Sequence, residues 1–596
     1  MTVEKLITDH IDIWSSALQT RSTAGRGSNG KIDLYGIKKL RELILELAVR
    51  GKLVPQDSND EPASELLKRI AAEKAELVKQ GKIKKQKPLP EISEDEKPFE
   101  LPVGWKWARL SDISKYIQRG KGPKYAEHGS VKVVSQKCVQ WSGFKLEQSR
   151  WITDESIHSY TEERFLKDGD VLWNSTGAGG TAGRVIYLPI VKGKLVIDSH
   201  VTLIRTVRDN GQFISNYIST YGVQQRFDPK HSKTLLSGTT NQAELNSSVV
   251  TSFLVPFPPQ NEQERINDKA AELMSLCDQL EQQSLTSLEA HQQLVETLLV
   301  TLTDSQNAKE LAENWARISQ HFDTLFTTEA SIGALKQTIL QLAVMGKLVP
   351  QDPNDEPASE LLKRIEQEKA QLVKEGKIKK QKPLPPISDV EKPFELPQGW
   401  VWIRFGEILA ELKYGTSQKC DYSTNGYPVL RIPNVVGGEI SLEDMKFGKL
   451  SKHEVKELSL KKDDLIFIRS NGSLSIVGQC TLLRQTLVDH AYAGYLIRAR
   501  MFSDSVCAEY ISLMMKTFFI RDQIEKPIRT TTGVKNINSS ELSNLKLALP
   551  PLSMQKEIVE KTDILLSFCE SLQSRLQSAQ QTQLHLADAL IHAALN

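Results

Sequence analysis

The sequence predicts an α+β protein, in which two mixed, mainly β domains are separated by a pair of long antiparallel helices and framed by duplicated helical regions. Three observations predict this fold. A stretch of chain occurs twice, at 40–107 and 335–402, and the copies agree at 53 of 68 positions. The segment after each copy has strand-like runs and does not match its counterpart. Each segment is followed by a stretch with apolar residues seven positions apart.

Length and composition limit the classes of protein to be considered. A chain of 596 residues predicts about three to five domains, and 39% hydrophobic residues are enough for real cores. There is no run of about 18 apolar residues to span a membrane, and no basic segment followed by an apolar one at the N-terminus. We therefore expect a cytoplasmic protein. The six cysteines form no CxxC pair, so we expect neither a zinc site nor a disulfide frame.

The start of the chain and the first repeat predict a flexible segment followed by two helices. Residues 1–30 are polar and end in a glycine- and serine-rich run, which predicts a flexible lead. Residues 34–49 have helical periodicity, and Gly51 can cap that helix. Residues 64–79 predict an amphipathic helix that ends at Gly81.

The connections in the repeat carry turn and linker signals. Asp60 is the predicted N-cap of the second helix, with Pro62 in its first turn. Residues 82–102 are charged and proline-rich, which predicts a linker or arm. The second copy repeats the pattern, with Gly346 as the cap. Each arm begins with a basic run that could contact phosphates or be a solvated helix end: Lys82, Lys84, Lys85 and Lys87, then Lys377, Lys379, Lys380 and Lys382.

Each segment after a repeat opens with the motif LPxGWxW and continues as strand-like runs separated by turn signals. This pattern predicts two mixed, mainly β globular domains. The expected strands are 131–136, 170–174, 184–190 and 200–207 in the first domain, and 427–433, 464–470, 476–483 and 495–501 in the second.

A search for catalytic motifs identifies no reaction. Residues 174–184 are rich in glycine, but they lack the Lys-Ser/Thr ending of a phosphate loop and lead into strand-forming residues. A β-hairpin turn is the better interpretation. There is no HExxH motif, the cysteines have no clear base and the histidines do not cluster. We therefore expect no catalytic residue and no metal ligand on this chain.

The stretches after the β domains have matched heptad patterns. Apolar residues recur every seven positions from Ile266, and the same register recurs 292 residues later from Ile558. This favours two helices of about 40 residues that pack on each other. The alternative is that each stripe packs on its own neighbouring domain.

Charge is distributed unevenly along the chain. Residues 108–235 hold 19 Lys and Arg against 12 Asp and Glu, and residues 403–530 hold 18 against 15. Two mildly basic domains on a neutral frame suit contact with phosphates. Ordinary surface charge would fit these counts about as well.

The repeated motifs carry a family resemblance. Three motifs of the frame resemble the specificity subunits of type I restriction–modification enzymes. They are the sequence GKLVPQD-x-NDEPASELL, the motif LPxGWxW, and the tract with PP, a glutamine and an isoleucine before each long helix. The doubled frame is most similar to the branch with a long N-terminal conserved region, commonly called type IB. The resemblance divides the chain into five regions: an N-terminal conserved region (1–102), a first target-recognition domain (103–257), a central conserved region (258–397), a second target-recognition domain (398–549) and a C-terminal conserved helix (550–596).

This resemblance implies a DNA-reading subunit without catalytic residues of its own. Each target-recognition domain would bind one half of a split, asymmetric site in double-stranded DNA, with the helices holding the two apart. The conserved regions would bind two modification subunits, which methylate adenine with S-adenosylmethionine. Restriction subunits that use ATP and Mg2+ would join the same assembly.

Four groups of loop residues in each domain are candidates for DNA contact. Gly120 and Gly415 align at an offset of 295, and in family members their loop faces DNA. Guanidinium and amide groups can pair with base edges, and hydroxyls and cations suit phosphates. The candidates in the first domain are Arg119, Lys121 and Lys124; Gln136, Lys137 and Gln140; Asn174 and Ser175; and Thr239, Thr240 and Asn241. Those in the second are Lys413, Tyr414 and Lys419; Arg431 and Asn434; Arg469, Ser470 and Asn471; and Arg529, Thr531, Thr532, Lys535 and Asn536.

Two other functions remain open on the sequence. A coiled-coil scaffold with two protein-binding β domains would share the frame and the heptads, and salt-dependent binding to duplex DNA would exclude it. A DNA enzyme that acts alone is the other, and incubating the purified chain with DNA and cofactors would reveal it.

Overall fold

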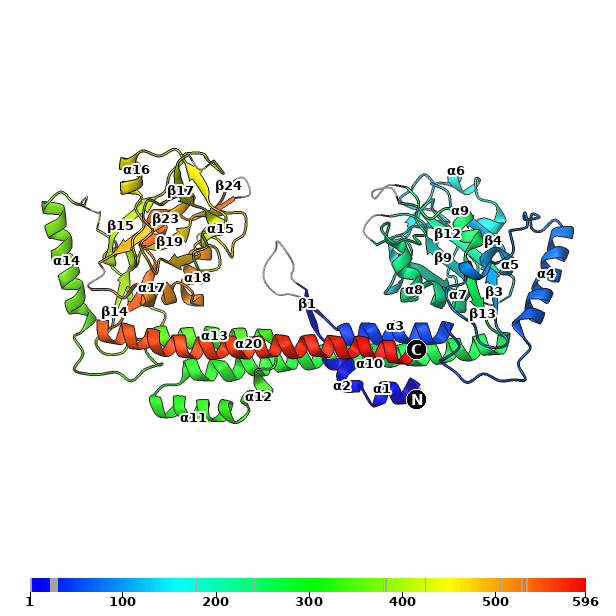
Figure 1. The fold of residues 1–596 in the computed structure, drawn as a ribbon, viewed down its shortest axis with the longest axis horizontal. Coiled ribbons are helices and arrows are strands. Elements are labelled where there is room, and N and C mark those ends of the chain that lie inside the picture. The colour runs from blue at the N-terminus through cyan, green and yellow to red at the C-terminus, as the bar shows by residue number, and fades with distance from the viewer. Residues whose placement is uncertain are drawn as a thin grey trace. The chain divides into compact units, whose positions relative to one another are not determined.

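The computed structural model describes residues 3–21, 31–177, 180–208, 210–238, 243–378, 380, 383–423, 425–502, 505–526, 529–531 and 534–595. These residues form two compact units (Figure 1). The first unit is built from Met1–Gln19, Leu34–Leu285 and Thr582–Asn596, and the second from Thr20–Asp33 and Thr286–Gln581. Each unit combines one β domain with pieces of the helical frame. No described helix is long and apolar enough to cross a membrane.

The repeat folds into two helices in each unit, as predicted. They are α3 (Tyr35–Val49) and α4 (Ala63–Lys79) in the first unit, and α13 (Glu329–Val344) and α14 (Ala358–Lys374) in the second. Gly51 and Gly346 follow the first helix of each pair with φ of 67° and 68°. Gly81 and Gly376 follow the second helix, and both have φ of 70°. All four predicted caps therefore have the left-handed backbone that glycine adopts most readily.

Asp60 does not cap α4, so that prediction is wrong. Pro62 stands at the N-cap position. The Asp60 carboxylate instead accepts a hydrogen bond from Arg265 of α10 (Gln260–Asp304) at 2.7 Å, and this bond lowers the pKa of Asp60. In the second unit, Ser553 of α20 (Leu552–Leu595) donates to the equivalent Asp355 at 2.6 Å. The turn between the frame helices thus binds the start of the following long helix.

The N-terminal residues are also ordered where the structure describes them, in contrast to the predicted flexible lead over 1–30. They form α1 (Val3–Thr8), α2 (Ile11–Ser16) and β1 (Gln19–Arg21), which pairs with β2 (Lys31–Asp33). Trp14 and Ala17 are completely buried. Gly36 of α3 donates its N–H to the Ala17 carbonyl at 2.9 Å, and a Cβ on Gly36 would lie 2.3 Å from the Trp14 carbonyl oxygen. The lead therefore packs on α3, and residues 1–2 and 22–30 of it lie outside the described residues.

The first β domain is built on a four-stranded antiparallel sheet, in the order β10-β9-β12-β4. The strands are β4 (Ser114–Arg119), β9 (Asp170–Asn174), β10 (Val185–Leu188) and β12 (Val201–Thr206). A second sheet has the order β11-β5-β8, with β5 (Lys132–Val134), β8 (Arg150–Trp151) and β11 (Leu195–Ile197). The helix α7 (Gly211–Ile218) packs on β9 and β10, and α8 (Tyr221–Gln224) follows it.

The second β domain repeats this topology. Its main sheet has the order β15-β23-β19-β21, which matches β4-β12-β9-β10 strand for strand. The strands are β15 (Leu409–Tyr414), β19 (Leu465–Ile468), β21 (Cys480–Leu482) and β23 (Leu496–Met501). The strand β17 (Tyr427–Leu430) pairs in parallel with β22 (Ala491–Tyr492), as β5 does with β11. The helices α17 (Ala508–Met514) and α18 (Phe518–Glu525) stand where α7 and α8 do in the chain order.

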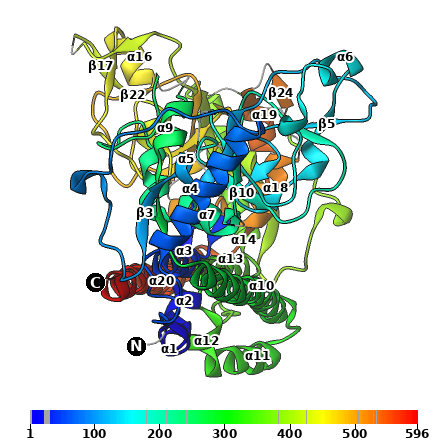
Figure 2. The same cartoon turned by 90° about the vertical axis from the view of Figure 1, so that its right-hand side faces the viewer.

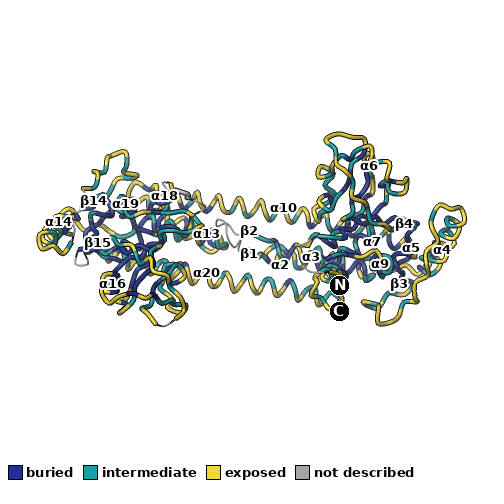
Figure 3. Tube along the Cα trace, turned by 90° about the horizontal axis from the view of Figure 1, so that it is seen from above, coloured by how far each residue is buried: buried dark blue, intermediate teal, exposed yellow. Residues whose placement is uncertain are grey.

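The strand predictions are confirmed in both domains, since each predicted run contains an observed strand. The glycine-rich segment 174–184 joins β9 to β10, which are antiparallel with Trp173 opposite Val185. It is therefore a hairpin connection, as predicted. The strand residues form most of the buried interior of each domain, whereas the long helices are largely exposed or half-buried along their length (Figure 3).

Two frame motifs pair to form the base of each β domain. The strand β3 (Lys106–Arg109), from LPxGWxW, is antiparallel to β13 (Leu254–Phe257), from the PFPP tract. In the second unit β14 (Val401–Arg404) pairs in the same way with β26 (Lys546–Leu549). The chain therefore enters and leaves each domain at one place. A domain attached in this way can change its sequence without changing its connection to the frame.

The arm between α4 and β3 is fixed to the domain. Arg109 donates to the Pro90 carbonyl at 3.1 Å and to the carboxylate of Glu96 at 3.2 Å. Arg404 makes the same contacts with the Pro385 carbonyl and Glu391. Figure 2 shows α4 beside α5 (Leu110–Ile113), which it contacts. The frame helix thus belongs to the same compact unit as the domain it precedes.

The two heptad stretches are single helices, α10 and α20, but they do not pack as a simple pair. In the second unit α13 contacts both of them. Lys336 of α13 donates to Gln573 of α20 at 3.0 Å, and Gln577 donates to Glu329 at 3.2 Å. Lys347, just after α13, donates to the Thr303 carbonyl of α10 at 2.6 Å.

A shared core explains this packing. Apolar residues of α10, α13 and α20 and of α11 (Ala308–Gln320) and α12 (Phe322–Leu325) form one buried cluster. The contacts above make α13 antiparallel to α20, while His291 and Thr303 of α10 lie against Thr324 and Lys347, so α10 runs the same way as α13. In this unit the long helices are therefore antiparallel, as predicted, with a third helix in contact with both.

The first unit has the corresponding arrangement around α3. Arg41 of α3 pairs with Asp278 and Glu281 of α10, both at 2.7 Å. Tyr35, at the start of α3, donates to Asp588 of α20 at 2.8 Å. The prediction of two long helices is confirmed, but the contacts described run from each of them to the repeated frame helices, and Leu294 and Leu586 of the predicted stripes are exposed.

Candidate nucleic-acid interface

The first candidate loop has the same close contact in both domains. Gly120 follows β4 and Gly415 follows β15. A Cβ on Gly120 would lie 2.2 Å from the carbonyl oxygens of Ile197 and Asp198, and one on Gly415 would lie 2.2 Å from that of Tyr492. The backbone N–H of Gly120 donates to the Val201 carbonyl at 3.0 Å. The alignment at offset 295 therefore identified equivalent positions, where only glycine fits.

The three cations of this loop in the first domain have different surroundings. Arg119 donates to the Ser199 carbonyl and contacts the carboxylate of Glu244. Lys121 donates to the Ser159 carbonyl at 2.8 Å. Lys124 is exposed and pairs with Glu155 at 3.0 Å. All three ammonium or guanidinium groups are at least partly accessible.

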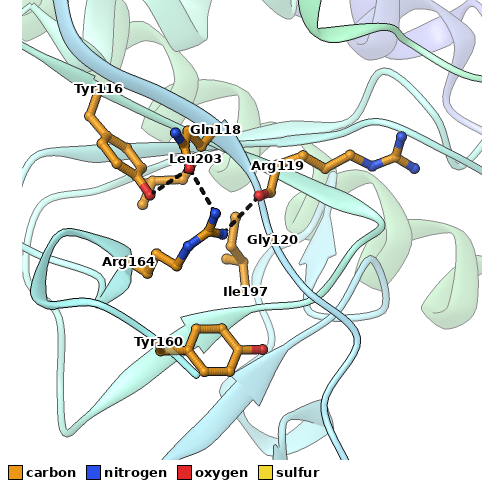
Figure 4. Close-up of a pocket in the computed structure, with 8 residues that line it drawn as sticks. All are labelled: Tyr116, Gln118, Arg119, Gly120, Tyr160, Arg164, Ile197 and Leu203. Atoms are coloured by element: carbon orange, nitrogen blue, oxygen red, sulfur yellow. Dashed lines mark hydrogen bonds between the residues drawn. The ribbon is translucent and has the colours of Figure 1, made fainter. Parts of the chain in front are cut away.

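A fourth cation, which the sequence did not indicate, lies beside this loop. Arg164 donates to the Arg119 carbonyl at 3.1 Å and to Gln118 Oε1 at 2.8 Å. In Figure 4 its guanidinium lies between these two groups, while the Arg119 side chain points away from it. The side chain comes from a 3-10 turn after α6 (Asp154–Ile157), a segment that carries no strand or loop signal of its own.

The second group lies at a turn beside the glycine-rich hairpin. Lys137 is exposed. Gln140 donates to the Lys137 carbonyl at 2.9 Å and accepts from Arg184, a residue of the hairpin. Gln136 Oε1 is buried and has no hydrogen-bond partner among the described residues. This group therefore combines a free cation with amides held close to the surface.

Asn174 and Ser175 do not lie on the surface. Both are completely buried. The Asn174 amide donates to the carbonyls of Gln136, Val139 and Thr181, and the Ser175 hydroxyl bonds to Thr202. They hold loops together and are not part of the candidate surface.

Thr239, Thr240 and Asn241 lie outside the described residues. The chain on either side of them is described and pairs through Ser237 and Glu244. Glu244 also forms a bridge with Thr176. The described chain beside the fourth group therefore pairs with Thr176 of the hairpin.

In the second domain the first group is partly paired. Lys413 donates to Glu457 at 3.1 Å, a bond that lowers the pKa of Glu457. Tyr414 accepts a hydrogen bond from the Ser539 N–H at 2.9 Å. Lys419 is exposed.

The second group of this domain is a compact turn. Arg431 donates to the Asp444 carboxylate at 2.7 Å and lowers its pKa, while Arg431 Nε has no partner among the described residues. Asn434 is buried, and its amide donates to the carbonyls of Ser441 and Asp444. Asn434 is therefore a positioning residue for Arg431 rather than a surface contact.

The third and fourth groups of the second domain come together in one small sheet. The strands β20 (Ser470–Asn471), β24 (Arg529–Thr531) and β25 (Val534–Asn536) pair in the order β20-β25-β24. Ser470 lies opposite Asn536, to which its hydroxyl donates, and Asn471 lies opposite Lys535. Arg529 and Thr531 belong to β24, and Thr532 lies outside the described residues.

The structural alignment shifts the third group by one residue. Ser175 N–H donates to the His200 carbonyl, and Arg469 N–H donates to that of Tyr495. Ser175 is therefore the counterpart of Arg469, and Thr176 is the counterpart of Ser470. Thr176 is half-buried, and its hydroxyl bonds to His200 Nδ1 at 2.6 Å.

The residues that sequence reasoning missed in the first domain are Thr176, His200, Glu244, Arg164 and Arg184. Matching the end of β9 to the end of β19 by their buried Asp170 and Asp464 would have indicated Thr176, because that offset is 294 rather than 295. No sequence signal marks the others.

The two domains share one fold and are joined at equivalent places to a repeated helical frame, but they differ in their polar loops. This arrangement is that of a protein that recognises two different targets from one scaffold. The comparisons with known proteins indicate that the recognised molecule is DNA. A family model described as "Type I restriction modification DNA specificity domain" matches residues 102–290 and 397–580. The chain therefore belongs to the family of type I restriction–modification DNA specificity subunits, which are non-catalytic DNA-recognition proteins.

The most similar relatives reported span the whole chain. The specificity subunit of the type I restriction enzyme EcoEI from Escherichia coli is 52% identical over 100% of both chains. The specificity subunit of EcoAI, from the same species, is 48% identical over 100% of both. A solved structure described as the structural basis of complex assembly and conformational transition of the type I R-M system covers 84% of this chain and 99% of its own, with 16% identity and a TM-score of 0.47.

Proposed function

We propose that each target-recognition domain reads one half of a split, asymmetric site in double-stranded DNA. The observation that supports this most directly is the paired base of each domain, β3 with β13 and β14 with β26. It makes the two domains interchangeable modules with different loops. Partner subunits then methylate adenine or restrict the DNA at the site that the modules select.

A module exchange tests this proposal. Residues 110–253, which lie between β3 and β13, are replaced by the corresponding residues of a relative, so that both strands are kept intact. Mapping methylated adenines by sequencing should show one half-site replaced and the other unchanged. If both half-sites change, or if neither does, the modules do not read separate halves.

We also propose that the repeated frame binds two copies of one modification subunit. The twelve residues from Asn59 to Ile70 recur without change from Asn354 to Ile365. Packing explains the identity at Ala63, Leu66 and Ile70, which are buried. It does not explain the identity of the exposed ion pairs, which are Glu65 with Lys68 and Arg69 with Glu61 in the first copy and Glu360 with Lys363 and Arg364 with Glu356 in the second.

These partners would supply the reactive cofactors of the assembly. Modification subunits would bind S-adenosylmethionine, and restriction subunits would bind ATP and Mg2+. This chain would hold none of them. We further propose that the protein works in the cytoplasm, where its DNA is, and that it belongs to the type IB branch, because of its long N-terminal conserved region.

A further inference from the structure

One guanidinium occupies the same place in both recognition domains, although it comes from different strands. In the first domain Arg119, at the end of β4, donates to the carbonyl of Ser199. In the second domain Arg469, just after β19, donates to the carbonyl of Gly494 at 3.5 Å. The two carbonyls are equivalent, because they belong to residues 295 positions apart. Each of these residues directly precedes the one whose carbonyl accepts a hydrogen bond from the N–H of Ser175 or Arg469.

The surrounding backbone fixes this equivalence. Gly120 and Gly415, next to positions 119 and 414, donate to the carbonyls of Val201 and Leu496. The N–H groups of Leu245 and Ile537 donate to the carbonyls of Ser175 and Arg469. Position 119 of the first domain is therefore structurally equivalent to position 414 of the second, and position 175 is equivalent to position 469.

The arginine stands at a different one of these two positions in each domain. The first domain has Arg119 and Ser175, and the second has Tyr414 and Arg469. Ser175 is buried and small, which leaves room for Arg119 to reach the carbonyl from β4. In the second domain Arg469 lies over the Tyr414 ring, with its guanidinium carbon 4.7 Å from the ring centre.

The guanidinium is available for a further contact in both domains. The Arg119 side chain is 27% exposed and also contacts Glu244, whose place is taken by Asn536 in the second domain. Arg469 is half-buried; its Nε is buried without a partner among the described residues, so its terminal N–H groups are the ones that can make a further contact. One donor is used to hold the group in place, and several of the five N–H donors of a guanidinium remain.

We propose that Arg119 and Arg469 are functional equivalents, each of which reads one guanine in the half-site of its own domain. A guanidinium held in a fixed plane can donate two hydrogen bonds to O6 and N7 of guanine in the major groove. The carbonyl of Ser199 or Gly494 supplies that fixed plane.

This inference rests on the proposed reading of one half-site by each domain, and it predicts that both half-sites contain a G·C pair. The first step of the test is to map methylated sites made by the complete complex of this chain with its modification subunits. If no split site is methylated, the proposed function itself fails. If a split site is found but either half lacks a G·C pair, only the present inference fails.

The second step uses substitutions in the complete complex. Arg119→Ala should relax one G·C position in the first domain's half-site, with a loss of discrimination of about 5- to 150-fold against the other base pairs, and leave the other half-site unchanged. Arg469→Ala should do the same in the other half-site. The matched controls are Lys192→Ala and Arg484→Ala, which remove an exposed cation beyond the far end of β10 or β21. An unchanged motif, or a uniform loss of binding across all sequences, overturns the inference.

A third measurement does not depend on the folding of a variant. The wild-type complex is titrated against target duplexes in which each guanine in turn is replaced by 7-deazaguanine, which lacks the N7 acceptor. One guanine in each half-site should lose affinity on replacement, and the Arg119→Ala complex should no longer distinguish the replaced from the natural base in its half-site. Equal affinity of the wild-type complex for all of these duplexes overturns the inference.

Discussion

At the scale of single residues, the sharpest expectation concerns Gly120 and Gly415, the equivalent glycines of the first candidate loop in each domain. Gly120→Ala should destabilise the first domain by about 1–3 kcal/mol, because the new Cβ would overlap two carbonyl oxygens that the sheet holds in place. Gly122→Ala is the matched control, since its nearest atom, Ser199 Oγ, would lie 4.0 Å from the Cβ. Denaturant unfolding of both variants measures the difference. Equal stability would show that the loop moves freely away from the 197–198 backbone.

The same scale shows why some candidate residues were misplaced. Every residue of β9 is buried, so the side chains at its end do not alternate between buried and exposed positions as they do in a strand with one solvent-facing side. Asn174 and Ser175 were chosen at the end of β9, where Thr176 is the residue that reaches the surface. Polar type alone could not distinguish them, because a buried asparagine that bonds three carbonyls has the same sequence signature as an exposed one.

At the scale of elements, the exposed face shared by α4 and α14 carries a prediction about assembly. Changing Glu65 and Glu360 together to lysine should weaken binding of the modification subunit at both copies, because each reversal breaks an exposed ion pair and inverts the charge of a surface that is identical in the two copies. Exposed pairs add little to stability, so folding should be preserved. Sedimentation of the chain with its partner measures the assembly.

The control for this experiment lies on the same helix. Glu76 is exposed on α4, and the second copy has Gln371 at that position, so a partner that binds both copies cannot depend on it. Glu76→Lys should therefore leave assembly intact. Normal assembly of the Glu65 and Glu360 double variant would show that this face is not the docking surface.

Elements with a long period or a clear cap were predictable, and short ones were not. The helices α3, α4, α13 and α14 each span several turns and end at a glycine with positive φ, so their pattern is strong. The helices α1 and α2 have six residues each, too few for a period to show, and they form because Trp14 is buried by tertiary packing on α3. The packing of α13 on both long helices was likewise not readable from heptads, which report an apolar stripe but not its partner.

At the scale of the whole molecule, the two recognition domains are linked through two continuous helices of 45 and 44 residues. A helix advances about 1.5 Å per residue. If these helices set the number of unread base pairs between the half-sites, changing their length by whole heptads should change that number and nothing else. A heptad is the correct step because seven residues turn the helix by nearly two complete turns, which preserves the apolar face.

The deletion can be placed between the frame contacts described above. In α10 it removes residues 282–288, which follow Glu281, the partner of Arg41, and precede His291. In α20 it removes residues 579–585, between Gln577 and Asp588. Shortening each helix by about 10 Å corresponds to about three base pairs of B-DNA at 3.4 Å each. Methylation mapping of the active variant should show the same half-sites with about three fewer base pairs between them. An unchanged spacer would show that the length of these helices does not determine the distance at which the two halves are read.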